Sequence, residues 1–147
     1  MLQERASSWH ACSHEGAKVV AVSFGAYLFL HAQAQLPPCV GSVLLLSPIV
    51  GEFANDARGM NFVPPYEDRL RALAAGGQFR ALPRRHIHVG SEDWQSDPVS
   101  VVTLGKQVGI GVTVVPGAGH MLGKEYVGSV LDGWLTGRAK EGFVAGA

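Results

Sequence analysis

Three side chains of complementary chemistry, Ser23, Asp93 and His120, are spread along the sequence. A serine hydroxyl is a poor nucleophile at neutral pH until a base removes its proton during the attack. An imidazole suits that task because its ordinary pKa, about 6.5, lets it accept the proton and return it. A carboxylate can hold the imidazole tautomer and stabilise the imidazolium. Together these residue types could transfer an acyl group to water through an acyl-enzyme on Ser23.

Ser23 stands at the junction of a predicted strand and a predicted helix. Residues 19–22 are apolar and mostly β-branched, which is typical of a strand buried on both faces. Residues 26–34 favour a helix, and Pro37 and the proline after it end that helix. The hydroxyl therefore lies on a sharp strand-to-helix turn.

Small residues flank the serine on both sides, Ala21 two positions before it and Gly25 two positions after it. We expect both positions to require small side chains because such a turn brings the strand and the helix close together. The same turn would direct backbone N–H groups of the helix start, including that of Phe24, toward a group bound beside Ser23.

The alternation of strands and helices continues to the end of the chain. Strands are predicted at 42–48, 84–90 and 112–116, and helices at 66–75, 99–108 and 124–135. This order predicts a parallel α/β sheet, in which sites gather at the carboxyl ends of the strands. Asp93 follows the strand at 84–90 and His120 follows the strand at 112–116, so we expect both to emerge at the same edge as Ser23.

The segment Ala21-Val22-Ser23-Phe24-Gly25 resembles the Gly-x-Ser-x-Gly nucleophile elbow of the α/β-hydrolase superfamily, with Ala at the first small position. The loops Gly90-Ser91-Glu92-Asp93 and Pro116-Gly117-Ala118-Gly119-His120-Met121 also resemble those of the family, and Ser, Asp and His occur in its order. The resemblance implies an esterase-like serine hydrolase that acts on a small acyl substrate. It further implies an oxyanion donor from the Phe24 N–H and no cofactor or metal.

Only the C-terminal half of that fold has a counterpart in the sequence. In the complete fold the elbow follows the fifth strand, whereas 22 residues precede Ser23 here. We therefore expect a truncated α/β-hydrolase-like fold, a three-layer parallel sheet of about four strands flanked by helices. The elbow strand would become an edge strand open to pairing, which predicts a homo-oligomer or a complementing N-terminal chain.

The shortened fold also affects the predicted chemistry. Family members take a second oxyanion donor from a loop in the N-terminal half, and only the Phe24 N–H has a counterpart here. Losing one such donor costs about 3 kcal/mol of transition-state stabilisation. The alternative hypothesis is therefore a non-catalytic α/β-hydrolase-like remnant, or a binding domain that needs a partner chain to complete its sheet.

Other residues compete for the predicted roles. Asp97, which precedes a proline at a helix start, is an alternative acid to Asp93, and Glu92 is a weaker third choice. His120 could be an ordinary loop histidine. The pair His86 and His88 alternates on a predicted strand, where packing or surface roles are favoured over ligation.

Composition limits the classes of partner. The chain has 147 residues, of which 47% are hydrophobic and 16% charged, and its formal net charge is zero. These values favour a folded domain and provide no overall attraction to nucleic acid or an anionic membrane.

Cys12 and Cys39 form no disulfide framework or redox motif, and the first residues form no signal pattern, so we expect a soluble cytoplasmic protein. The alternation of His10, Cys12 and His14 lacks a second ligand cluster and does not predict a metal site.

The sequence predicts one domain over residues 1–136, followed by a frayed tail at 137–147. Residues 49–80 interrupt the regular pattern with turn-forming residues and are predicted to form a loop or lid-like insertion. Apolar side chains that could cover an acyl chain there are Phe53, Met60, Phe62, Val63 and Tyr66.

Overall fold

Four parallel strands form the central sheet of the chain, in the order β1-β2-β5-β6. The computed structural model describes residues 14–37, 39–77, 79 and 84–138. The strands are β1 (Lys18–Val22), β2 (Ser42–Leu46), β5 (Arg85–Gly90) and β6 (Gly111–Val115). All carboxyl ends therefore point to one edge of the sheet, as the sequence predicts.

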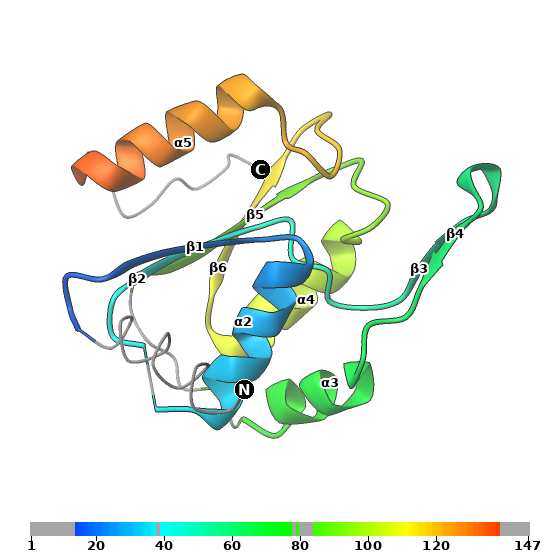
Figure 1. Cartoon of the computed structure of the whole chain (residues 1–147), viewed down its shortest axis with the longest axis horizontal. Coiled ribbons are helices and arrows are strands. Elements are labelled where there is room, and N and C mark those ends of the chain that lie inside the picture. Colours follow the sequence, from blue (N-terminus) through cyan, green and yellow to red (C-terminus); the bar gives the residue numbers. More distant parts are fainter. Residues whose placement is uncertain (1–13, 38, 78, 80–83, 139–147) are drawn as a thin grey trace, which may run out of the picture.

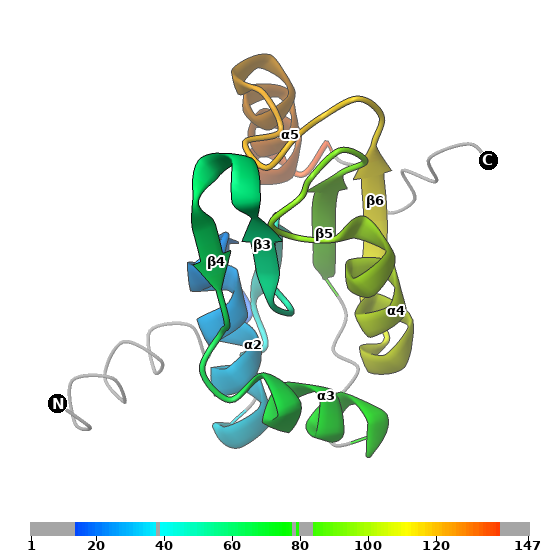
Figure 2. The same ribbon diagram turned by 90° about the vertical axis from the view of Figure 1, so that its right-hand side faces the viewer.

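Helices cover both faces of this sheet and make three layers (Figures 1 and 2). The helices are α2 (Phe24–Gln35), α3 (Glu67–Ala75), α4 (Pro98–Val108) and α5 (Lys124–Thr136). Helices α2 and α4 pack on one face with α3 against them, and α5 packs on the other. The predicted three-layer α/β fold of about four strands is confirmed, and the predicted elements are shifted by no more than two or three residues.

Strand β1 is an edge strand that pairs only with β2 among the described residues. Its side chains at Val20 and Val22 are 42% and 52% exposed. The prediction that residues 19–22 are buried on both faces is therefore wrong for one face. The physical reason is that α5 packs over Leu44, Leu46 and Val115 and its end meets β1 at Lys18, whose Nζ donates to the Trp134 and Leu135 carbonyls. Among the described residues, Val20 and Val22 stay largely exposed.

Residues 49–66 contain more structure than the sequence predicts. Two short strands, β3 (Phe53–Asn55) and β4 (Met60–Phe62), pair in an antiparallel hairpin that projects from the body of the molecule (Figures 1 and 2). A single 3₁₀ turn, η1 (Asp56–Arg58), joins them, and the Asn55 side chain accepts a hydrogen bond from the Arg58 N–H. Strands of three residues are too short to show an alternating pattern, so the prediction of a loop missed them.

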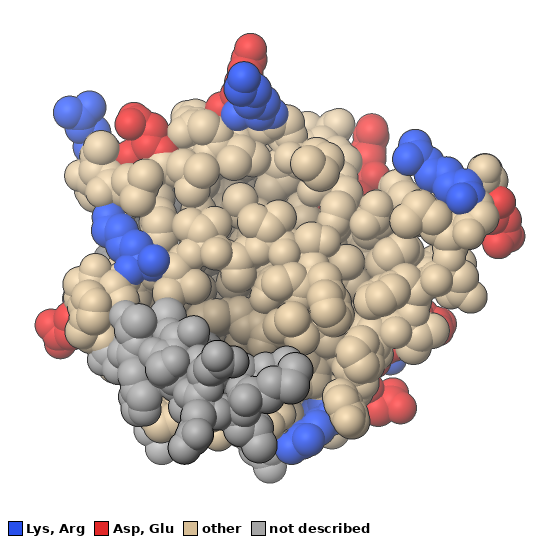
Figure 3. Space-filling model, viewed as in Figure 1, with Lys and Arg blue, Asp and Glu red and all other residues tan. Residues whose placement is uncertain are grey.

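The face nearest the reader in Figure 1, with β1 and α2 in front, carries its charged side chains mostly at the rim (Figure 3). Exposed apolar side chains on these two elements include Val20, Val22 and Leu28. Among the described residues, no helix has both the length and the apolar character that crossing a bilayer requires.

Some predictions fall on residues outside the described part of the chain. His10 and Cys12 fall within residues 1–13, outside the described part of the chain. Of the predicted tail at 137–147, only Gly137 and Arg138 are described. Helix α5 ends at Thr136, and Gly137 follows it with a left-handed φ of 70°.

Gly25 does not fulfil the steric role expected from the sequence. A Cβ built on this residue meets nothing within 4 Å among the described residues, so the expectation that Gly25 must be small is wrong here. Gly105 of α4 shows the opposite situation, because a Cβ there would lie 2.8 Å from the Ile110 carbonyl oxygen.

Gly25→Ala should therefore stabilise the chain by about 0.5 kcal/mol, because alanine loses less backbone entropy in a helix than glycine. Gly105→Ala is the matched control and should destabilise it by about 1–3 kcal/mol through overpacking. Urea unfolding of both variants measures the difference, and equal loss of stability in the two would contradict the assignment of open space around Gly25.

Two histidines of β5 lie between the sheet and α5. The Nδ1 atom of His88 is 2.7 Å from the Tyr126 hydroxyl, and the Nε2 atom of His86 is 2.7 Å from the Thr113 hydroxyl. Burial, reinforced by the neighbouring His86, lowers the pKa of His88 from 6.5 to about 4. The proton therefore binds the unfolded chain at a higher pH than it binds the folded chain.

This difference predicts loss of stability in acid. Above pH 6.5 His88 is neutral in both states and costs nothing, whereas between pH 6.5 and about 4 only the unfolded chain takes up the proton. The free energy of unfolding should fall in that window with a slope approaching about 1.4 kcal/mol per pH unit from this group. Urea titrations at a series of pH values should show a shallower slope in His88→Gln than in the wild-type chain.

Candidate active site

Ser23 occupies a strained turn between β1 and α2. Its backbone has φ 55° and ψ −123°, a conformation that costs a non-glycine residue about 1–3 kcal/mol. The Ser23 N–H donates to the Leu46 carbonyl at 2.9 Å, which ties the turn to the end of β2. This geometry fits the strand-to-helix turn predicted around the serine. Phe24 is the first residue of α2, so its N–H belongs to the first turn, which lacks intrahelical acceptors.

The structure brings Ser23, His120 and Asp93 together from three different loops. The Ser23 Oγ lies 2.8 Å from His120 Nε2, and His120 Nδ1 lies 2.9 Å from Asp93 Oδ2. The His120 side chain is 13% exposed and the Asp93 side chain is fully buried. The imidazole thus bridges the hydroxyl and a carboxylate that is shielded from water.

Backbone donors stabilise the buried carboxylate of Asp93. Its Oδ1 atom accepts hydrogen bonds from the N–H groups of Gln95 and Ser96, each at 2.9 Å. A buried charge is costly unless it is paired and hydrogen-bonded, and Asp93 has both the imidazole and these two donors. The carboxylate is consequently held toward His120.

The alternative acids lie elsewhere. Asp97 is the N-cap of α4, and its Oδ2 accepts from the N–H of Ser100 at 2.9 Å and from its hydroxyl at 2.6 Å. The hydroxyl bond is the largest cause that lowers the pKa of Asp97. Glu92 is exposed, and its backbone N–H donates to the Ala118 carbonyl. Of the three candidates, the structure therefore places Asp93 against the imidazole.

Two serines that were not predicted from the sequence hold the histidine loop, the segment after β6 that carries His120. The Ser47 hydroxyl, at the end of β2, donates to the His120 carbonyl at 2.7 Å. The Ser96 hydroxyl donates to the Ser47 carbonyl at 2.8 Å and lies 3.4 Å from His120 Nδ1. Both serines are fully buried. The strand-end rule could have found Ser47, because it follows β2 at the same edge, whereas no pattern marks Ser96.

Hydrogen bonds also join the histidine loop to the acid loop, the segment after β5 that carries Asp93. The Glu92 N–H donates to Ala118 at 3.0 Å, and the Gly117 N–H donates to the Ser91 hydroxyl at 2.8 Å. A Cβ on Gly90 would overlap the Ala118 carbonyl, so this close approach requires glycine. These hydrogen bonds therefore hold the two loops against each other beside the serine.

A row of aromatic rings runs from the elbow to the acid loop. Phe24 contacts Phe62 of β4 edge-on, with ring centroids 5.7 Å apart. Phe62 and Phe53 of the hairpin are 5.4 Å apart, and Phe53 meets Trp94 edge-on at 5.4 Å. Two of the five predicted lid residues, Phe53 and Phe62, thus belong to this row, whereas Met60, Val63 and Tyr66 are exposed.

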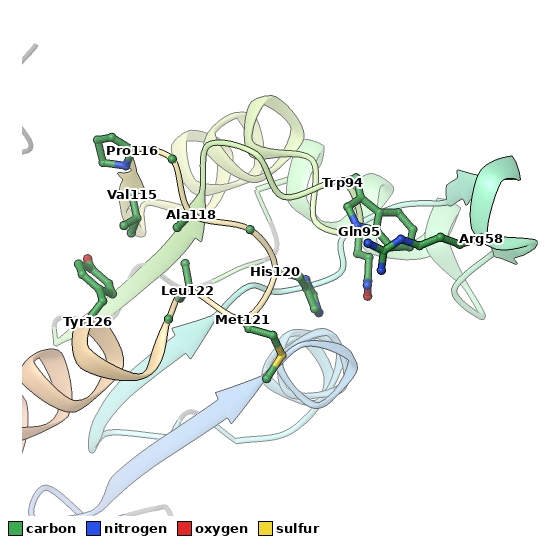
Figure 4. Close-up of a pocket in the computed structure, with 13 residues that line it drawn as sticks. Arg58, Trp94, Gln95, Val115, Pro116, Ala118, His120, Met121, Leu122 and Tyr126 are labelled. Carbon is green, nitrogen blue, oxygen red and sulfur yellow. The ribbon is translucent and has the colours of Figure 1, made fainter.

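An open groove of about 680 Å³ lies beside the histidine (Figure 4). Residues 115–123 and Tyr126 line one part, and Arg58, Trp94 and Gln95 line the other. Ser23 is not part of this lining, and it contacts the lining residue His120 through its Oγ, 2.8 Å from Nε2. No cluster of three or more metal-ligating side chains occurs in the described part of the chain.

Comparison with solved structures finds the same architecture in proteins of low sequence identity. A Mycobacterium tuberculosis H37Rv protein described as a non-heme bromoperoxidase, BpoC, is 16% identical, with a TM-score of 0.62 over 93% of this chain and 73% of that chain. The ydeN gene product of B. subtilis is 16% identical, with a TM-score of 0.59 over 92% and 73% of the two chains. A CIB-like hydrolase from Thermoplasma acidophilum is 14% identical, with a TM-score of 0.55 over 89% and 55%. No family model matches the sequence, and no curated protein matches it.

These neighbours are α/β-hydrolase-fold proteins. Identities of 14–16% carry the fold and not the activity. The parallel order β1-β2-β5-β6, with helices on both faces, agrees with the architecture that the elbow motif predicts. The chain has the α/β-hydrolase fold, with a four-stranded parallel sheet over the described residues.

Proposed function

We propose that the chain is an esterase-like serine hydrolase that acts on a small acyl substrate, with Ser23 as nucleophile, His120 as general base and Asp93 as the acid partner. The observation that carries the proposal is the pair of contacts of one imidazole: Nε2 lies 2.8 Å from the Ser23 Oγ, and Nδ1 lies 2.9 Å from Asp93 Oδ2. A general base must lie within hydrogen-bond reach of the proton that it removes, and this one does.

The proposed reaction has two acyl-transfer steps. The Ser23 Oγ attacks the substrate carbonyl carbon while His120 Nε2 takes the hydroxyl proton, and Asp93 stabilises the resulting imidazolium. The tetrahedral intermediate places its oxyanion toward the Phe24 N–H, then collapses as His120 protonates the leaving group. Water attacks the acyl-serine in the same way, with His120 again as base, and releases the acid and the serine.

The oxyanion is the weak point of this mechanism. The first turn of α2 offers one donor, the Phe24 N–H, and a second is expected from a loop in the family. Removing one oxyanion donor typically lowers kcat by about 10²- to 10³-fold. We propose that the uncovered edge of β1 pairs with a second copy or with a complementing N-terminal chain, and that this partner supplies the second donor.

A second candidate function follows from the same edge. Exposed Val20 and Val22 beside the serine suit a non-catalytic domain that binds a partner or a small ligand at this face. The two functions differ in whether Ser23 reacts as a nucleophile.

A serine-directed fluorophosphonate probe tests this difference. The folded wild-type chain should become labelled, and Ser23→Ala should lose the label because the attacking oxygen is gone. Ser129→Ala, which removes an exposed hydroxyl on α5, is the matched control and should label like the wild type. Absence of labelling in a chain with a native circular dichroism spectrum would favour the binding domain.

The two candidate acids are separated by a pair of conservative variants. Asp93→Asn should lower kcat/KM for a p-nitrophenyl ester by about 10³- to 10⁴-fold, because the amide holds the imidazole in the wrong tautomer. Asp97→Asn should keep the activity close to that of the wild type, because asparagine is an equally good N-cap for α4. If hydrolysis is too slow to follow, the rate of probe labelling measures the same difference, and a larger loss in Asp97→Asn would refute the assignment.

A further inference from the structure

Arg58 is a cation at one end of the groove that contains His120. It lies at the end of η1, on the projecting hairpin, and its guanidinium reaches back toward Trp94 and Gln95 (Figure 4). The same groove is lined by His120 at its other part. Arg58 is exposed, and its side chain lines the same groove as the imidazole.

Trp94 gives Arg58 its position. The guanidinium carbon lies over the indole ring, 5.7 Å from its centroid, within the range in which a cation is attracted to an aromatic face. The indole is itself held edge-on against Phe53 of the hairpin. Stacking on a ring uses the flat face of the guanidinium and leaves its N–H edge available to acceptors.

The acid loop connects this arrangement to the candidate triad. Trp94 directly follows Asp93, and the Gln95 N–H donates to the Asp93 Oδ1 at 2.9 Å. The backbone on both sides of the indole is therefore fixed by the carboxylate that faces His120. Any ligand held by Arg58 and Gln95 has a defined position relative to the imidazole.

The charge of Arg58 is not neutralised within the described residues. No carboxylate there forms an ion pair with it, and Asp56, its near neighbour in η1, does not line the groove. Among the described residues that line the groove, Arg58 carries the one permanent charge and no carboxylate is present. The Gln95 side chain adds an amide with two N–H donors at the same end.

We propose that Arg58, stacked on Trp94 and assisted by Gln95, is a subsite for a carboxylate, and that the substrates are acyl esters bearing a second, anionic carboxyl group. This inference rests on the proposed hydrolase function and names its substrate class. A guanidinium matches a carboxylate with two parallel N–H bonds, which is stronger and more directional than a neutral contact. The indole of Trp94, which lines the groove, offers apolar surface to the methylene chain between the two carboxyl groups.

The test compares monomethyl with dimethyl esters of linear dicarboxylic acids from succinate to suberate, followed by titration of the released acid at constant pH. The wild-type chain should prefer the monoester at one chain length. Arg58→Gln should lower the ratio of kcat/KM values, monoester to diester, by about 10- to 100-fold at that length. Arg58→Lys should retain part of the ratio, because it keeps the charge and loses the planar fork.

Arg69→Gln is the matched control, because Arg69 is an exposed arginine on α3 that does not line this groove. This variant should keep the wild-type ratio. A ratio that is the same in Arg58→Gln and in the wild type at every chain length would overturn the inference.

A binding measurement separates failure of this inference from failure of the proposed hydrolase. The same free dicarboxylates should change the fluorescence of Trp94 in the wild type and in Ser23→Ala, with about 10-fold or greater weakening in Arg58→Gln. Trp94→Phe identifies the source of the signal. Arg58-dependent binding without probe labelling of Ser23 would refute the hydrolase and keep the carboxylate subsite. Probe labelling of Ser23 without Arg58-dependent binding would refute the carboxylate subsite and keep the hydrolase.

Discussion

One residue, His120, contacts groups that follow three different strands at the carboxyl edge of the sheet. The Nε2 atom of His120 meets the serine that follows β1, its Nδ1 atom meets the acid that follows β5, and its carbonyl accepts from the serine that follows β2. Because His120 itself follows β6, all four strands of the sheet contribute to the surroundings of a single residue. Its position therefore depends on all four strands, and a register slip of β1, β2 or β5 would separate His120 from the partner that follows that strand.

Ser23, the proposed nucleophile, follows an edge strand of that sheet. Ser23 is held in a strained backbone conformation, and among the described residues β1 pairs on one side alone, with β2. Strain at a functional residue persists only where the surrounding structure over-determines it. Here the constraint comes from the Ser23 N–H bond to Leu46, from the start of α2 and from His120. A chain that pairs with the uncovered edge would add a second support at the residue that most needs it.

The sequence predicts the regular part of this structure and the residues that meet at its edge, for a physical reason. Buried parallel strands give continuous apolar runs, and residues that follow them must emerge at one edge, which is how Ser23, Asp93 and His120 can be grouped before any coordinates. Ser96 and Trp94 could not be found in this way, because they act through hydroxyl and ring contacts between loops. The hairpin was not predicted because its strands are short. The steric prediction for Gly25 was wrong because its motif normally implies a crowded turn.

The acid loop connects the candidate triad with the groove. Asp93 faces the imidazole, while the next residue, Trp94, packs against the hairpin and positions Arg58. The triad residue Asp93 and the groove residues Trp94 and Gln95 are therefore consecutive in the chain, and the Gln95 N–H donates to the Asp93 carboxylate. The hairpin is not part of the central sheet, and its aromatic contacts with the site are those of Phe53 and Phe62 with Trp94 and Phe24. In the proposed hydrolase, selectivity would thus be set by the hairpin, outside the sheet, while the sheet itself positions Ser23, Asp93 and His120.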